Sequence, residues 1–191
     1  MQAIILDALR QTTEEHDIGK VLSALLTNRG WEQETFFLRQ MEITPCSSCG
    51  RCAMDTPGLC FIKDGMEEIY SRWANCQLLI FCTPISFGGY HSSLKMVLDR
   101  IMPMNTPYFA LRKGELHHAN RYHPMPSLLA IGLLSGDSGL DRDRERNTFE
   151  YLIERNAVNM NIDRFASAVF LPEHTAAQVL TRLEQALKEV L

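Results

Sequence analysis

Five short runs, mainly apolar except for the half-polar run at residues 31–38, alternate along the 191-residue chain with segments whose apolar residues recur at helical spacing. A strand that is buried on both faces of a parallel sheet has no polar face, so it appears as a nearly continuous apolar run. We therefore expect strands over residues 2–8, 31–38, 77–82, 127–134 and 162–171. Alternation of strands and helices with right-handed crossovers predicts an α/β fold with a doubly wound parallel sheet.

The segments between these runs carry helical signals. Helices are expected over residues 17–28, from residue 64 onward, and over 94–102, 144–157 and 175–191. Thr175 is a candidate helix cap, and Asp64 with Glu67 three residues later has the form of a capping box. The length suits one domain, residues 1–191, with a five-stranded sheet in the order 2-1-3-4-5. An insertion at residues 103–126, before the fourth strand, is too long for an ordinary connection.

Four cysteines fall within fifteen residues of the loop after the second strand, in the pattern C-x2-C-x2-C-x7-C. They are Cys46, Cys49, Cys52 and Cys60. A segment this short wraps its sulfurs around one small inorganic centre, as in iron–sulfur and zinc sites. Three closely spaced cysteines with a fourth nearby favour a 4Fe–4S cluster, because zinc sites more often use two separated C-x2-C pairs. Cys76 and Cys82 adjoin an apolar strand and are expected to be buried.

The composition narrows the partners and the compartment. The formal net charge is −4, with 23 acidic and 19 basic residues, and no basic run is present, so neither a nucleic acid nor a membrane surface is an expected partner. The apolar stretch at the start is too short for an export signal. A dense cysteine cluster without such a signal favours metal binding over disulfide bonds. It also favours a cytoplasmic location.

Doubly wound sheets bind ligands beyond the carboxyl ends of their strands, where three loops are expected. These loops span residues 8–17, 83–91 and 135–140. In the second loop, Gly88 and Gly89 let the backbone approach a flat ligand, although the same residues suit an ordinary turn. Ser135 and Gly136 in the third loop fit a ligand loop and an ordinary turn equally well.

Three stretches together resemble one known family. PCSSCGRC, TPGLCFIKDGMEEIY and LLIFCTPISFGGYHSSLKMVLDRIMP are similar to the flavodoxin-like NAD(P)H-dependent FMN reductases, in particular the iron–sulfur flavoprotein branch. The resemblance covers residues 31–134 by motif and the rest by element order. It implies a flavodoxin-like fold, 4Fe–4S ligation by the four cysteines, and a dimer. It also implies flavin contacts from the loop after strand three, at Pro84, Ile85, Ser86, Phe87, Gly88 and Gly89.

The chain departs from the family after the first strand. Family members carry a Ser/Gly-rich phosphate loop there, whereas this chain has DALRQTTEEHD, which lacks glycine and adds acidic residues. Arg10, Thr12 and Thr13 partly substitute as one cation and two hydroxyls, and Ser135 and Gly136 complete the expected FMN contacts. The contrary interpretation is a relative that binds FMN weakly or not at all.

The resulting hypothesis is an FMN-dependent oxidoreductase that takes hydride from NAD(P)H and passes electrons through the cluster to an unidentified acceptor. No catalytic side chain is assigned, because the flavin carries the chemistry. One alternative is an FMN or quinone reductase without a cluster, its cysteines empty or holding zinc, as aerobic preparation favours. Another is a non-redox, metal-stabilised binding protein on the same scaffold.

Two further expectations concern surfaces. The insertion at 103–126 carries His117, His118 and His123 and is expected to be a solvated loop or dimer arm rather than a metal site. Its apolar residues, among them Tyr108 and Phe109, predict a homodimer that buries them. Leu94, Lys95, Asp99 and Arg100 match a family signature and are interpreted as helix packing and surface pairing.

Overall fold

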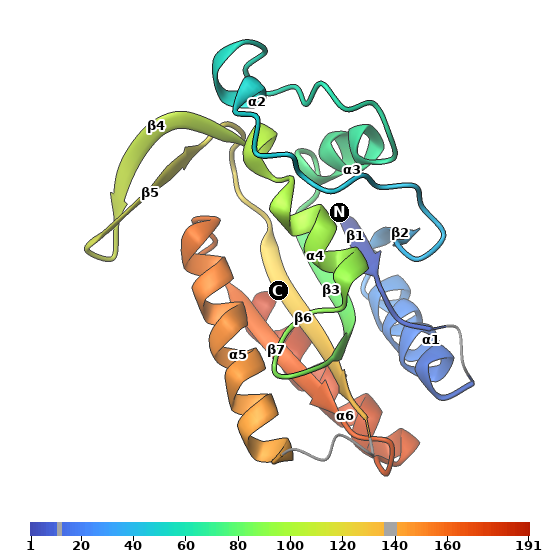
Figure 1. The fold of residues 1–191 in the computed structure, drawn as a ribbon. Coiled ribbons are helices and arrows are strands. Elements are labelled where there is room, and N and C mark those ends of the chain that lie inside the picture. Colours follow the sequence, from blue (N-terminus) through green and yellow to red (C-terminus); the bar gives the residue numbers. More distant parts are fainter. Residues whose placement is uncertain (11–12, 136–140) are drawn as a thin grey trace.

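The computed structural model describes residues 1–10, 13–135 and 141–191, with the side chains of 13–17 left out (Figure 1). A five-stranded sheet has the order β2-β1-β3-β6-β7, and every neighbouring pair is parallel. Its strands are β1 (Gln2–Asp7), β2 (Glu32–Phe37), β3 (Leu78–Ile85), β6 (Ser127–Leu134) and β7 (Phe165–Phe170). The predicted order 2-1-3-4-5 is confirmed, since β4 and β5 belong to a separate hairpin.

Six helices are described around the sheet. They are α1 (Thr13–Asn28), α2 (Arg51–Met54), α3 (Met66–Trp73), α4 (Ser92–Asp99), α5 (Arg142–Asn159) and α6 (Ala176–Val190). Side chains of α1 and α6 join the apolar cluster on one face of the sheet, and those of α3, α4 and α5 join the cluster on the other. Covered faces on both sides explain why the central strands β1, β3 and β6 are nearly continuous apolar runs, whereas the edge strand β2 has the mostly polar sequence EQETFF.

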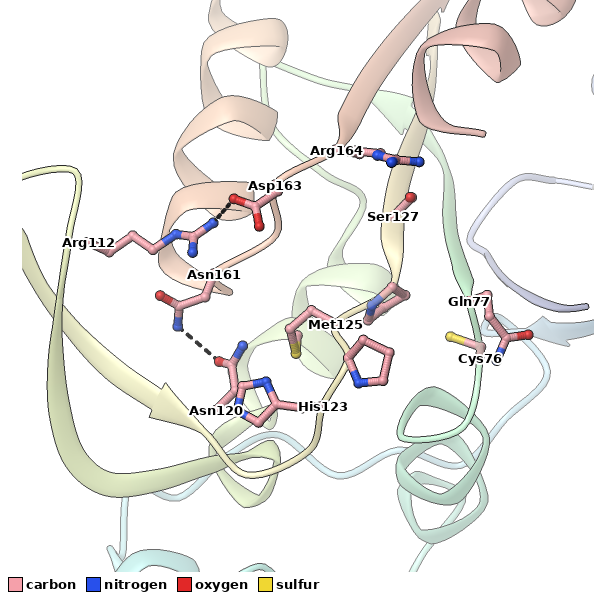
Figure 2. Close-up of a pocket in the computed structure, with 12 residues that line it drawn as sticks. Cys76, Gln77, Arg112, Asn120, His123, Met125, Ser127, Asn161, Asp163 and Arg164 are labelled. Atoms are coloured by element: carbon pink, nitrogen blue, oxygen red, sulfur yellow. Dashed lines mark hydrogen bonds and ion pairs between the residues drawn. The ribbon is translucent and has the colours of Figure 1, made fainter.

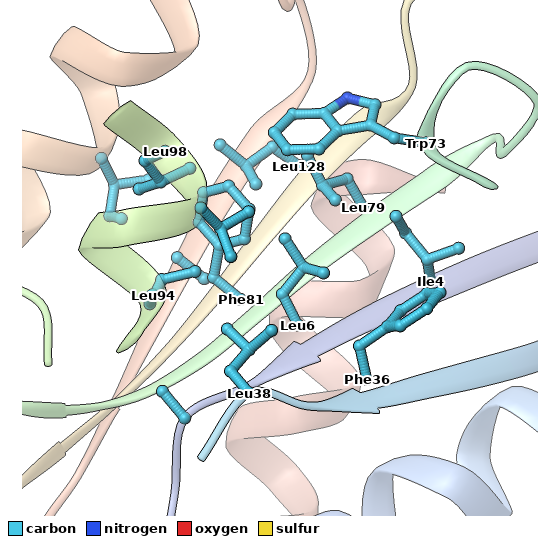
Figure 3. Close-up of a cluster of buried hydrophobic side chains, with 14 of the residues drawn as sticks. Ile4, Leu6, Phe36, Leu38, Trp73, Leu79, Phe81, Leu94, Leu98 and Leu128 are labelled. Carbon is cyan, nitrogen blue, oxygen red and sulfur yellow. The ribbon is translucent and has the colours of Figure 1, made fainter. Parts of the chain in front are cut away.

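Successive strand residues divide between these two clusters. Ile4 and Leu6 of β1 point to the face shown in Figure 3, toward Leu94 of α4, while Ala3 and Ile5 point to the opposite face. All four are 5% exposed or less. Each fully buried aliphatic side chain contributes about 1.5–3 kcal/mol, so the two clusters fix the strand register.

The two predicted helix caps have different outcomes. Thr175 caps α6 in a capping box with Gln178, as expected for its position. The Asp64–Glu67 capping box is wrong, because Glu67 pairs with Lys63 at 2.5 Å instead. Asp64 Oδ1 accepts from the Met66 N–H at 3.1 Å, and α3 begins at Met66.

The insertion at 103–126 forms a hairpin rather than an irregular loop. A 3₁₀ turn, Met102–Met104, leads into β4 (Asn105–Arg112), which pairs with antiparallel β5 (Glu115–Asn120). The two-residue turn places Lys113 at φ 49° and Gly114 at φ 81°, the backbone that two-residue hairpin turns favour. The hairpin extends away from the main sheet (Figure 1).

Among the described residues, no helix is long and apolar enough to cross a membrane.

Candidate functional site

The four motif cysteines line one cavity of about 290 Å³, which we call the cysteine pocket. It is formed by the segment that follows β2 in sequence together with Asp99, Arg100 and Met102 at the end of α4, and the segment curls tightly where Ser48 and Gly50 have positive φ. The Ser48 N–H approaches the Cys46 sulfur at 3.5 Å. All four thiols are free: Cys46 and Cys49 are exposed, and Cys52 and Cys60 are half-buried.

The thiols lie within electrostatic reach of one another. Burial raises the pKa of the Cys52 thiol, and the neighbouring Cys60, Cys49 and Cys46 raise it further. Within residues 1–10, 13–135 and 141–191, however, no three His, Cys, Asp or Glu side chains gather as ligands of a metal ion. The four cysteines line one shared cavity.

A buried arginine anchors this pocket, and its interpretation as a surface pairing residue is wrong. Arg100 is 2% exposed and donates to Asp64 and to the Cys60 sulfur. Burial alone lowers the pKa of Arg100, but the hydrogen bonds to Asp64 and Cys60 outweigh it and raise the pKa. Lys95 and Asp99 do pair on the surface. The missed signal is helical spacing, since position 100 follows the buried Val97 by three residues.

The loop after β3, predicted to hold the flavin ring, is closed by hydrogen bonds. The hydroxyl of Thr83, which is fully buried, accepts from the His91 N–H at 2.9 Å. Ser86 and Gly89 form a tight turn, with the Gly89 N–H donating to the Ser86 carbonyl at 2.9 Å. Between them, Phe87 has φ 52° and is 81% exposed. The turn thus presents its tip to solvent.

Helix α5 supports this turn from one side. The Phe87 N–H donates to Oε1 of Glu145 at 2.7 Å, and Glu145 is 4% exposed. A Cβ added at Gly88, where φ is 74°, would lie 2.5 Å from Cβ and Cγ2 of Thr148. Gly88 is therefore required for packing against α5, whatever its role toward a ligand. A Cβ added at Gly89 would contact only the carbonyl oxygen of Ser86 in the same turn, at 3.5 Å, so this position leaves space for a ligand.

The remaining predicted flavin contacts are placed unevenly. The Ile85 side chain packs into the core, where a Cβ at Gly132 would lie 2.5 Å from it, so only the Ile85 backbone faces a ligand. Pro84 is half-buried, and Ser135 is exposed just after β6. Thr12 and Gly136 lie outside the described residues, and Thr13 is described only as the first backbone position of α1.

Basic side chains from three segments gather beyond the carboxyl ends of β1 and β2. Arg39 Nε donates to the Ala8 carbonyl at 2.6 Å, next to the predicted phosphate contact Arg10. Partial burial lowers the pKa of His91, and the positive charges of Arg39 and Arg10 lower it further. Sequence reasoning missed Arg39, because nothing in the sequence shows that the segment after β2 meets the loop after β1, whereas His91 ends the predicted ligand loop 83–91. These charges fit an anionic group such as the FMN phosphate.

One carboxyl opposes these charges. Asp7 ends β1, and burial raises its pKa although the Leu9 N–H, 2.8 Å from Oδ1, and the charge of Arg39 act against the rise. We call Asp7, Arg10, Arg39, the loop 83–91 and Ser135 the flavin edge. Helix α4, eight residues and about 12 Å long, runs from this edge to the cysteine pocket.

A further cavity, of about 480 Å³, lies where β3 and β6 begin, opposite the flavin edge (Figure 2). Several polar side chains that line it are paired with one another. Arg112 pairs with Asp163, and the Asn161 amide donates to Asn120 at 3.0 Å. The other polar side chains of this cavity are less concentrated than the four thiols of the cysteine pocket or the basic side chains of the flavin edge. This cavity is therefore not the candidate site.

Sequence comparisons point to one family. The sequence model of the family described as "NADPH-dependent FMN reductase" matches residues 3–119, more than half of the chain. An iron–sulfur flavoprotein from Methanosarcina thermophila is 33% identical over 96 residues, which cover 49% of each protein. A second from Archaeoglobus fulgidus is 33% identical over 107 residues, 56% of this chain and 53% of the relative. The matched region thus spans about half the length of these relatives.

Solved structures share the fold along nearly the whole chain. An NAD(P)H:quinone oxidoreductase from Methanothermobacter marburgensis has a TM-score of 0.67 at 12% identity, covering 98% of this chain and 96% of its own. An FMN-dependent NADH-azoreductase from Bacillus anthracis, solved in complex with FMN, has a TM-score of 0.66 at 13% identity, covering 100% and 99%. At these identities the likeness establishes the flavodoxin-like fold alone.

Proposed function

Because the chain belongs to the NADPH-dependent FMN reductase family, we propose that it is an FMN-dependent oxidoreductase. It takes hydride from NAD(P)H and passes electrons through a 4Fe–4S cluster to an acceptor. When bound, FMN supplies both hydride acceptance and single-electron transfer, and the protein's task is to bind, orient and shield it. The names of the sequence relatives, both iron–sulfur flavoproteins, support this branch of the family.

The observation that carries the proposal is the cysteine pocket. Four free thiols line one cavity of about 290 Å³, and we propose Cys46, Cys49, Cys52 and Cys60 as the cluster ligands. The sequence spacing C-x2-C-x2-C-x7-C supports iron–sulfur over zinc, because zinc sites more often use two separated C-x2-C pairs.

The flavin edge is the proposed FMN site. The backbone of residues 84–89 would border the ring, with Ser135 and Gly136 from the neighbouring loop. Arg10, Thr12 and Thr13 would hold the phosphate, with Arg39 adding a positive charge from beyond β2. The chain's own contribution is positional: Glu145 and Thr148 of α5 hold the turn that would face the ring.

Anaerobic reconstitution followed by two independent measurements tests the proposal. We expect about four iron and four sulfide per chain, with a broad visible absorption. We expect FMN titration to give a saturable fluorescence change. Absence of iron and sulfide would refute the cluster, and absence of FMN binding by the loaded protein would refute the flavin. Aerobic preparation is expected to leave the cysteines empty or zinc-loaded.

A reductase without a cluster is the second candidate. The structural neighbour described as an NAD(P)H:quinone oxidoreductase supports it. It predicts FMN binding and NAD(P)H oxidation by iron-free protein. A non-redox, metal-stabilised binding protein predicts metal without flavin. The same two measurements separate all three.

The hairpin supports a proposed homodimer. Tyr108 and Phe109 on β4 are 75% and 63% exposed, and Leu111 and Leu116 beside its turn are 74% and 71% exposed. So many exposed apolar side chains suit a two-fold contact that buries them. We propose that the chain is one domain that pairs through this arm in the cytoplasm. Light scattering at micromolar concentration is expected to give twice the chain mass, and a stable monomer with full flavin content would contradict the arrangement.

A further inference from the structure

Arg100 is the bulkiest fully buried side chain among the described residues. A buried guanidinium costs several kcal/mol unless its donors are paired. Arg100 directly follows α4, the helix that begins after the flavin loop, and its side chain leaves the helix for the cysteine segment. Its position therefore needs a reason beyond helix packing.

The guanidinium joins both ends of the cysteine segment. Nη1 donates to the Thr44 carbonyl at 2.9 Å and to Oδ2 of Asp64 at 2.5 Å. Nη2 donates to the Ile62 carbonyl at 3.3 Å and approaches the Cys60 sulfur at 3.4 Å. Thr44 precedes the first motif cysteine and Asp64 follows the last. One side chain, from the residue that directly follows α4, thus closes the segment that carries all four thiols.

The sulfur contact distinguishes this arrangement from an ordinary buried ion pair. Asp64 and two carbonyls would suffice to hold a structural arginine, although Nε of Arg100 is buried without a hydrogen-bond partner in the described structure. The Nη2 contact in addition places a permanent positive charge beside a thiol. Cys46, in contrast, receives a neutral backbone N–H from Ser48. Hydrogen bonds to the sulfurs and local charge are among the factors that set the reduction potential of an iron–sulfur cluster.

We propose that Arg100 is a positioning residue for Cys60: it fixes the sulfur at the wall of the cysteine pocket and raises the reduction potential of the bound cluster. The second part rests on the proposed function. A charged donor stabilises the reduced cluster, which carries one more negative charge, over the oxidised one. Asp64 offsets part of that charge, so the two residues act on the potential in opposite directions.

Redox titrations of reconstituted wild type, Arg100→Gln, Arg100→Lys and Asp64→Asn test this opposition. We expect Arg100→Gln to lower the midpoint potential, Arg100→Lys to lower it less, and Asp64→Asn to raise it. Lys95→Gln is the control, because Lys95 lies exposed on the same helix in a surface pair. If Arg100→Gln and Asp64→Asn shift the potential in the same direction, or not at all, Arg100 is only a structural ion-pair partner.

Hydrogen exchange of metal-free protein separates the two parts. Arg100→Gln is expected to speed amide exchange within residues 44–64, and Arg100→Lys less so. Unchanged exchange would overturn the positioning role even if the cluster forms. Failure of wild type to bind iron would refute the cluster while this measurement still decides the positioning role. If Arg100→Gln does not fold, Arg100→Lys and Asp64→Asn give the same comparison.

Discussion

The cysteine pocket and the flavin edge lie at opposite ends of α4 and are assembled in different ways. The pocket takes all four thiols from one segment, residues 46–60, closed by a single side chain from the residue that directly follows α4. The flavin edge draws on the loops after β1, β2 and β3 and on α5, held by contacts such as that from Glu145 to Phe87.

This difference decides how each region responds to change. In the pocket, all four thiols come from one short segment and act together on one bound group. Loss of a single thiol should therefore have an all-or-none effect on binding. At the flavin edge, several weaker contacts to the ligand come from segments that are distant in sequence. A single substitution should therefore reduce ligand binding only partly, by an amount that depends on the packing around it. Four predictions test this contrast, from the largest expected effect to the smallest.

Cys49→Ser should abolish iron binding, because a serine hydroxyl replaces one of the four proposed thiolate ligands. Iron and sulfide analysis after anaerobic reconstitution measures the loss. Cys76→Ser is the matched control. Cys76 is 5% exposed and its sulfur donates to the Trp73 carbonyl at 3.3 Å, a bond that serine also makes. Its iron content should stay at the wild-type level, and equal loss in both variants would remove the special status of the motif.

Much of the fold follows from local sequence. The central strands β1, β3 and β6 are predicted correctly because burial on both faces makes them apolar whatever their neighbours are. Cys76 and Cys82 are buried as expected for the same reason. The edge strand β2, with the sequence EQETFF, is predicted correctly without such an apolar run. The hairpin is missed because β4 is largely exposed, so its residues do not form a continuous apolar run. The Lys113–Gly114 turn was the available signal.

The candidate site is only partly readable for a related reason. The cysteine spacing is visible in one segment, so the thiols are found directly. Arg39, Glu145 and Arg100 act through tertiary contacts across 31, 58 and 40 residues of sequence, and a single sequence does not show such pairings. The sequence assigns Gly88 to ligand approach, whereas the structure shows that it packs against Thr148, which lies in a distant helix.

Gly88→Ala should weaken FMN binding through α5 rather than through the ring. Its Cβ would overlap Thr148, and its positive φ adds about 1–2 kcal/mol of strain. The double variant with Thr148→Gly removes the overlap, so FMN affinity should recover by more than half, with Thr148→Gly alone as the control. Fluorescence titration measures this. No recovery would show that the ring itself occupies the space at Gly88.

Arg10→Ala and Arg39→Ala should each weaken FMN binding about tenfold, the loss of one charge-assisted hydrogen bond of about 1.5 kcal/mol. The effect should be smaller in high salt, because both side chains are exposed. Arg155→Ala is the control, since Arg155 pairs with Glu115 of the hairpin. An unchanged affinity in both edge variants would place the phosphate elsewhere.

Asp7→Asn should give the smallest effect, a change in the pH dependence of stability. Burial raises the pKa of the Asp7 carboxyl above its ordinary value of 3.8, so the native state holds that proton more tightly than the unfolded chain does. The favourable contribution of Asp7 is therefore complete below pH 3.8 and is lost as the pH rises through the native pKa. Asparagine carries no charge at any pH and keeps an oxygen for the Leu9 N–H.

Urea unfolding between pH 3 and 8 should consequently show Asp7→Asn gaining stability over wild type as the pH rises. We expect a gain below about 1 kcal/mol, because solvent screens a half-buried group. Asp99→Asn, on the exposed face of α4, should show no such rise. If bound FMN enlarges the advantage of Asp7→Asn, the carboxyl opposes the phosphate directly. An advantage that is constant with pH would show that Asp7 is held by packing, and the edge would then resemble the cysteine pocket more than the contrast allows.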